Sequence, residues 1–284
     1  MTARRPFLSI VLLAIALLLG GCASRPTSLD EVRQFANASA MLGGYGELSQ
    51  RYRDTYAREQ PYLSPAAARV ARENDDKRKA HYDQFIAAQK ALVLYMKTLS
   101  VLAGDGRYDL TSELDDIGGG VQALAGNGME RRQVEAWTGL TRLVTRVLAS
   151  RYQGTSVAAM VREGDEDVRV LLDGMMTLTR LYAKTHQGEK QTILAVFEVE
   201  LPLNRKPGNR LLATMARVHY MEKIREFQLV ERRYDMALEG LTKVALGHQK
   251  MREHLVDLSG TEMRQMLAAY ARDLNLIRAA LAVN

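Results

Sequence analysis

The side chain with the clearest chemical potential in this sequence is the thiol of Cys22, the sole cysteine among 284 residues. A thiolate is a strong nucleophile, and a single cysteine cannot close an internal disulfide. Cys22 follows an apolar run from Phe7 to Leu19, and Gly20 and Gly21 stand between that run and the thiol. The role of this sulfur therefore has to be inferred from the segment that precedes it.

The first 21 residues have the order of a secretory signal. Arg4 and Arg5 precede the apolar run, which at 13 residues is shorter than the roughly 20 that a membrane-spanning helix needs. The end of this segment, Leu19-Gly20-Gly21-Cys22, resembles the lipobox of bacterial lipoproteins. The resemblance covers about the first two dozen residues and says nothing about the fold beyond them. An ordinary signal peptide that precedes a buried cysteine is the alternative.

The resemblance implies a specific processing scheme. In bacterial lipoproteins the thiol is diacylglycerylated, the preceding peptide is removed and the new amino terminus is acylated. Leu19, Gly20 and Gly21 would be the signal peptidase recognition residues, and Cys22 would be the lipidation site. Residues 1–21 would then be the signal peptide and residues 22–27 a lipidated tether. Three acyl chains, at about 0.8 kcal/mol per buried CH₂, would hold the protein on a membrane.

The residue after the cysteine bears on the membrane in which the protein would be anchored, and the net charge bears on the kind of partner it binds. Ala23 follows Cys22, where many inner-membrane lipoproteins have Asp, so the resemblance implies the outer membrane, facing the periplasm. The formal charge of +6 falls to +4 once Arg4 and Arg5 are removed. This weak excess is spread over the chain and does not indicate a nucleic-acid partner.

Histidine patterns do not predict a metal site. No His-Glu-x-x-His pattern occurs, and His248 and His254 are six residues apart, which points them in different directions on a helix. We expect no metal, and we expect the histidines to lie on helix surfaces; they are His81, His186, His219, His248 and His254.

Acidic patterns and nucleotide motifs are equally uninformative about catalysis. One acidic cluster lies in a Gly-rich stretch but does not match a twelve-residue calcium loop; it comprises Asp105, Asp109, Glu113, Asp115 and Asp116. Asp165, Glu166 and Asp167 suit a helix surface. Neither a Gly-x-Ser-x-Gly elbow nor a phosphate loop is present. We predict no catalytic residues and no cofactor, and Cys22 is the one residue with an assigned chemical role.

Apolar residues at alternating spacings of three and four dominate the rest of the chain. Ser64 before Pro65 is a good helix start, and the helix predicted there runs to Ala103. Similar stripes follow, represented by Val134 to Leu148, Val157 to Tyr182, Tyr220 to Ala245 and Met266 to Leu281. Such stripes need another helix against which to be buried. Residues 28–284 are therefore predicted to form a single all-α domain, an elongated antiparallel helical bundle with long coiled-coil-like helices.

Breaks in the pattern predict the connections. Residues 104–128 are rich in glycine, including Gly118-Gly119-Gly120, with at most a short helix from Thr111 to Ile117. Gly154 separates two helices, residues 202–209 form a turn, and residues 259–261 kink or interrupt the last helix.

One segment, Thr192 to Leu201, is rich in β-branched residues and allows either a helix or a strand. We predict a helix, because a lone strand would have unpaired edges. The segment could pack in the core or form a bundle tip that touches lipid or a partner, and core packing is the simpler interpretation.

Tyrosines mark the first predicted helix of the mature chain. Tyr45, Tyr52 and Tyr56 share a face, and Tyr62 follows. An aromatic face can bind a partner or a glycan, but packing on the bundle with the hydroxyl groups at the rim explains it more simply.

Three functions remain open at this point. The favoured one is a lipid-anchored, non-catalytic scaffold or accessory subunit with a protein partner in the cell envelope. The second is an enzyme acting on a cell-wall polymer through carboxylates that the fold brings together. The third is a membrane-active bundle that inserts the region Ile193 to Leu201.

Overall fold

The computed structural model describes residues 29–41, 44–104, 110, 131–151, 155–203 and 207–282. Within these ranges the secondary structure is helical and contains no strand, which confirms the predicted all-α class. The helices are α2 (Asp30–Ala40), α3 (Gly44–Arg53), α4 (Thr55–Glu59), η1 (Gln60–Tyr62), α5 (Pro65–Ala103), α8 (Arg131–Ala149), α9 (Val157–Leu203), η2 (Pro207–Asn209), α10 (Arg210–Glu253) and α11 (Thr261–Ala282).

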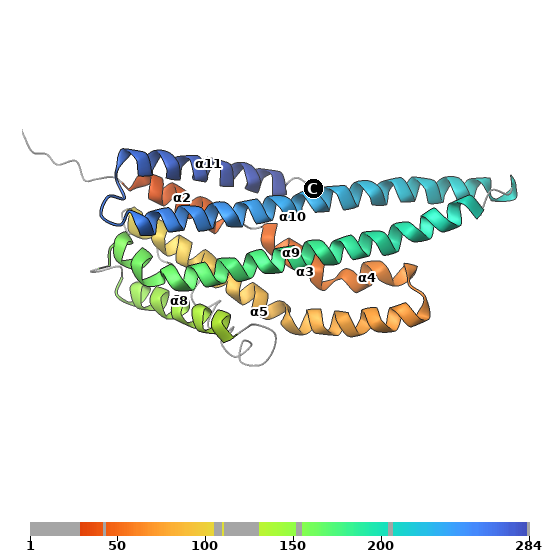
Figure 1. Cartoon of the computed structure of the whole chain (residues 1–284), viewed down its shortest axis with the longest axis horizontal. Helices are drawn as coiled ribbons and strands as arrows, with labels where there is room; N and C mark the ends of the chain where they lie inside the picture. The colour runs from red at the N-terminus through yellow and green to blue at the C-terminus, as the bar shows by residue number, and fades with distance from the viewer. Residues whose placement is uncertain are drawn as a thin grey trace, which may run out of the picture.

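Long helices with nearly parallel axes make the molecule a rod (Figure 1). The short helices α2, α3 and α4 lead from one end towards the other, and α5 returns. Helix α9 then covers most of the rod; with 47 residues at 1.5 Å per residue it is about 70 Å long. Helix α10 runs back along it for 44 residues. The predicted elongated antiparallel bundle is thus confirmed.

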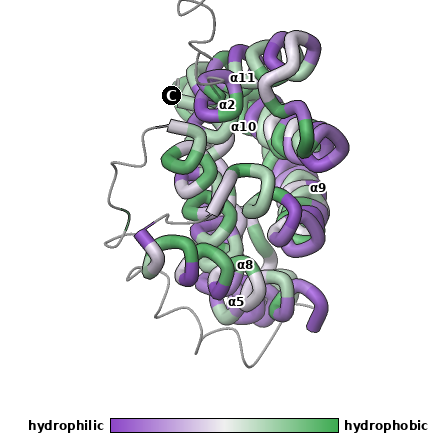
Figure 2. Tube along the Cα trace, turned by 90° about the vertical axis from the view of Figure 1, so that its left-hand side faces the viewer, coloured by the Kyte–Doolittle hydropathy of each residue, from purple (hydrophilic) through white to green (hydrophobic). Residues whose placement is uncertain are grey.

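The bundle is thickest at the end where α2 begins. Figure 2, which looks along the rod from this end, shows α2, α5, α8, α9, α10 and α11 around a common interior. Helix α2 packs on α5 and α11, α8 packs on α5 and α9, and α10 packs on α9 and α11. Helices α8 and α11 do not extend to the far end of the rod. There, the last turns of α9 and the first turns of α10 project beyond the other described helices (Figure 1).

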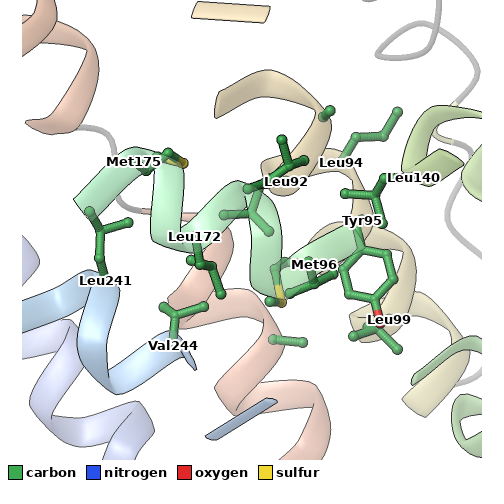
Figure 3. Packing of buried hydrophobic residues seen from close by; sticks show 14 of the residues in the cluster. Leu92, Leu94, Tyr95, Met96, Leu99, Leu140, Leu172, Met175, Leu241 and Val244 are labelled. Atoms are coloured by element: carbon green, nitrogen blue, oxygen red, sulfur yellow. The ribbon is translucent and has the colours of Figure 1, made fainter. Parts of the chain in front are cut away.

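The core is built from the predicted stripes. Leu92, Met96 and Leu99 of α5 point into the space shared with Leu172 and Met175 of α9 (Figure 3). These residues are buried because their spacing places them on one face of each helix. Helix α5 contains one stretch that is apolar and long enough to cross a membrane, but most of that stretch is buried within the bundle, as in a core helix.

The predicted helix ends are largely confirmed. The Oγ of Ser64 accepts a hydrogen bond from the backbone N–H of Ala67 at 3.3 Å, so it caps α5 as expected. The interruption at residues 259–261 separates α10 from α11. The segment Thr192 to Leu201 is helical and belongs to α9. The short helix predicted over Thr111–Ile117 lies outside the described residues.

Gly164 allows α9 to approach its neighbours closely. A Cβ atom added there would lie 2.7 Å from the ring of Tyr95 on α5 and 3.2 Å from a methyl group of Leu143 on α8. In contrast, a Cβ atom at Gly188, on the same helix, would meet no atom within 4 Å. The two glycines therefore differ in environment but share a backbone conformation.

This difference predicts opposite effects for one substitution at two sites in α9. Gly164→Ala should destabilise the fold by about 1–3 kcal/mol, since a buried aromatic ring would have to move. Gly188→Ala should stabilise it by up to about 1 kcal/mol, because alanine has the higher helix propensity. Urea unfolding of both variants measures the two changes, and equal effects at both sites would contradict the packing described for Gly164.

Candidate functional site

A groove of about 830 Å³ opens on the rod between α4, α5 and α9. Tyr52 and Phe85 lie at its inner side, and Val70 of α5 and Leu178 and Leu181 of α9 supply apolar walls. Val70 and Leu181 are 56% and 43% exposed, so they face solvent across the groove. Exposed apolar side chains that line a hollow are typical of a site that receives a partner or ligand.

Nearer the thick end of the rod, α8 packs between α5 and α9, and the groove lies between the same two helices further along. Where α8 packs, the indole Nε1 of Trp137 donates to the backbone oxygen of Ala87 on α5 at 3.1 Å, and Gln133 lies against Gly174 of α9. On α9, Leu178, Leu181 and Thr185 follow Gly174 at helical spacing and line the groove. Helix α8 begins at Arg131, and among the described residues no other helix lies between α5 and α9 beyond its first turn.

Polar groups with unused hydrogen-bonding capacity lie on the α5 side of the groove. The side chain of Arg78 is 10% exposed, and its Nη2 lies 3.6 Å from Oδ1 of Asp75, which also pairs with Lys79 at 2.6 Å. Among the described residues, Nε and Nη2 of Arg78 and Nδ1 of His81 are buried and make no hydrogen bond. Because these atoms have no accessible surface, Arg78 acts on a ligand in the groove through its positive charge rather than through these N–H groups.

One carboxylate lines the groove from the opposite side. Burial raises the pKa of Glu59, and the negative charge of Glu189 raises it further. Glu189 is itself 1% exposed and forms a two-pronged ion pair with Arg58, at 2.7 Å from Nε and 2.9 Å from Nη2. Because Glu189 is inaccessible and already bonded, the described lining of the groove holds one usable carboxylate rather than the pair that glycan hydrolysis requires.

The ion pair of Glu189 belongs to a larger cluster that joins three parts of the chain. Nη2 of Arg51 on α3 lies 2.9 Å from Oε1 of Glu226 on α10 and 3.6 Å from Oε1 of Glu189 on α9. Lys223 also pairs with Glu226, at 2.8 Å. The cluster thus connects the short N-terminal helices to the α9–α10 pair behind the groove.

A second polar cluster connects α5, α9 and α10. The hydroxyl of Tyr95 lies 2.9 Å from Nε2 of His248, whose Nδ1 lies 3.6 Å from Asp165. His248 lowers the pKa of Asp165, while burial raises the pKa of Tyr95 well above its usual value. Tyr95 is fully buried, so its hydroxyl keeps its proton and reaches no substrate. The cluster therefore holds the three helices together, and Asp165 and His248 also line a second hollow of about 680 Å³.

The expectation that the histidines lie on helix surfaces is wrong for His186 and His248, each 2% exposed. His248 hydrogen-bonds to Tyr95, and His186 lies 3.3 Å from the backbone oxygen of Phe227, so both polar rings have buried partners. A signal was present in the sequence: His248 continues the stripe of Leu241 and Ala245 at the same alternation of four and three residues.

The tyrosine face packs on the bundle, as predicted, but the expectation that its hydroxyl groups lie at the rim is wrong for Tyr45, which is buried. The hydroxyl of Tyr45 donates to the backbone oxygen of Met175 at 3.3 Å, and Tyr52 stacks on Tyr182 with ring centroids 4.4 Å apart. The segment from Thr192 is also packed at its start, since Ile193 and Leu194 are buried with Phe227.

Several predicted site residues fall outside the described ranges. They are the lipidation site Cys22, the recognition residues Leu19, Gly20 and Gly21, and the acidic cluster from Asp105 to Asp116. Within the described ranges, no group of three His, Cys, Asp or Glu side chains could hold a metal ion.

Comparison with known proteins adds no relative from which a function could be inferred. No family model, no curated protein and no solved structure matches the chain. The features of the chain that bear on its function are therefore the groove, the ion clusters, the exposed surface of the rod and the order of residues at the N-terminus.

Proposed function

We propose that this chain is a lipid-anchored lipoprotein of the bacterial envelope, held in the outer membrane through acylated Cys22 and facing the periplasm. There it acts as a non-catalytic scaffold or accessory subunit. The observation that carries the protein-binding part is the open groove between α4, α5 and α9. The anchoring part is supported by the lipobox-like order from Leu19 to Cys22.

The occupant that fits the groove is an amphipathic helix from a partner protein. Helix α8 fills the same space between α5 and α9 further along the rod, so the groove has neighbours arranged as a helix requires. The walls of the groove offer Val70 and Leu181 to an apolar face. An acidic side chain on the partner would be attracted by the positive charges of Arg78 and Lys77, which both line the groove.

Site-specific crosslinking in cells tests the protein-binding part. A photoreactive amino acid at Val70 or Leu181 should give one recurring protein adduct, and the same residue at Leu276 on α11 should not. Leu276 is the matched control because it is also an exposed leucine, 70% exposed, away from the groove. The proposal fails if the groove positions give no protein adduct or give the same adducts as Leu276.

Two further measurements separate the parts of the proposal. Arg78→Gln should reduce the groove adduct at least tenfold while leaving expression unchanged, because its attraction for an acidic side chain of the partner is lost. Mass spectrometry of the N-terminal peptide should show three acyl chains on Cys22. A free thiol at Cys22 would contradict the anchoring part and leave the groove argument intact.

A further inference from the structure

The α9–α10 hairpin extends past the last aromatic contact made by the short N-terminal helices. Tyr62 of η1 packs against Phe197 of α9 with ring centroids 5.8 Å apart, and its hydroxyl lies 3.0 Å from Nε2 of His219 on α10. Beyond this point the two long helices project past the other described helices (Figure 1). A pair of helices that protrudes in this way has no core of its own to cover apolar side chains.

Large apolar side chains are nevertheless concentrated and exposed on this projection. Leu211, Leu212 and Met215 are 74%, 62% and 62% exposed. We call the complete set the apolar tip: Val199 and Leu203 of α9, and Leu211, Leu212, Met215, Val218 and Met221 of α10. So many exposed large apolar side chains on one short part of the molecule mark a contact site better than singly scattered ones do.

The first three turns of α10 are apolar on both sides. Leu211, Met215 and Val218 recur at spacings of four and three and share the outward face. Ala213 and Ala216 are partly covered and occupy the side away from that face. An isolated two-helix hairpin needs the inner apolar side for packing, but it does not need the outer one.

The charges on these turns of α10 are of one sign. From Arg210 to Met221 the sequence contains Arg210 and Arg217 and no Asp or Glu, and both arginines are exposed. On α9, in contrast, the exposed Glu198 and Glu200 flank Val199. Leucine, methionine and valine flanked by arginine on a helix are characteristic of contact with a membrane interface that carries anionic lipids. An acidic lipid surface therefore complements the α10 side of the tip, since it offers negative headgroups above an apolar layer.

We propose that the apolar tip binds the surface of a bilayer that contains anionic lipids. Leu211, Leu212, Met215 and Val218 enter the boundary between headgroups and acyl chains, and Arg210 and Arg217 contact the headgroups. The contact surface is therefore the outward face of α10, whereas the start of the Ile193–Leu201 segment is core. It is independent of the groove, and it lies at the opposite end of the rod from the start of α2 (Figure 1).

The test uses the acylated full-length product in vesicles. Because Cys22 is the sole cysteine and is blocked by its lipid, Met215→Cys introduces one free thiol for an environment-sensitive dye. On vesicles of phosphatidylcholine with about one third phosphatidylglycerol, we expect at least a twofold rise in dye emission over pure phosphatidylcholine. The same dye at Leu276→Cys, also exposed, should show no difference between the vesicles.

The outcomes distinguish the occupants. Replacing both Arg210 and Arg217 by glutamine should abolish the preference for anionic vesicles. Equal emission on both vesicle types, or equal responses at residues 215 and 276, overturns the proposal. A rise that depends on protein density in uncharged vesicles indicates a second copy of the chain at the tip and also overturns it. Two dyes per molecule would instead reveal a free Cys22, which concerns the anchor and not the tip.

Discussion

Replacing Glu189 by alanine is expected to destabilise the protein by about 3 kcal/mol, because the partly buried guanidinium of Arg58 would lose its counter-ion. Glu189 is 1% exposed and binds Arg58 through both carboxylate oxygens, at 2.7 and 2.9 Å. Arg51 lies 3.6 Å from the same carboxylate. The loss should appear as a lower midpoint of urea unfolding, followed by circular dichroism.

The control for this prediction is Glu135→Ala on α8. Glu135 also pairs with an arginine, Arg131 at 2.9 Å, but the two side chains are 64% and 93% exposed. Such a pair on a helix surface contributes about 0.3–0.5 kcal/mol. If both variants changed the free energy of unfolding by the same small amount, the cluster at Glu189 would not hold the N-terminal helices to α9.

The second large effect is expected for Trp137→Ala, at about 3–5 kcal/mol, since the change removes the largest buried side chain of the core. Trp137 is 1% exposed and attaches α8 to α5 through its hydrogen bond to the backbone oxygen of Ala87, 3.1 Å long. The cavity would open where α8 meets α5, next to the end of the groove. Thermal and urea unfolding measure the loss.

Trp137→Phe separates the hydrogen bond from the packing. Phenylalanine keeps part of the ring volume and loses the N–H donor, so its cost should be less than half that of alanine. Loss of helical content in the alanine variant alone would show that docking of α8 depends on the ring. A cost for phenylalanine equal to that for alanine would contradict the packing argument and assign the stability to the hydrogen bond.

The fold class could be predicted because its signal is local. Stripes such as Leu92, Met96 and Leu99 repeat at helical spacing, and a helix cannot hide such a stripe alone. The cap at Ser64 and the interruption before Thr261 are also local, and both are present in the structure. The local signal for a helix over Thr192–Leu201 is weaker, because β-branched residues suit a strand as well as a helix. The packing of the start of this segment on Phe227 distinguishes the two.

The burial of polar residues could not be predicted in the same way. Glu189 has the sequence context of a surface residue, and its partners Arg58 and Arg51 are more than 130 positions away in the chain. The same is true of Tyr95 and His248, which are separated by 153 positions. A buried charge or imidazole is stable only when such a distant partner arrives, so tertiary structure decides which polar residues are internal.

The sequence by itself was enough to predict the helical rod and its turns and to propose a lipidated N-terminus, because each of these depends on residues close together in the chain. Only the tertiary structure showed where the rod stays open and where apolar side chains stay exposed. Within the part of the chain that the structure describes, α8 ends before the groove, so the space between α5 and α9 is not filled there. The apolar tip is exposed because α9 and α10 extend beyond the other described helices, so residues with the pattern of a core are not covered by any of them.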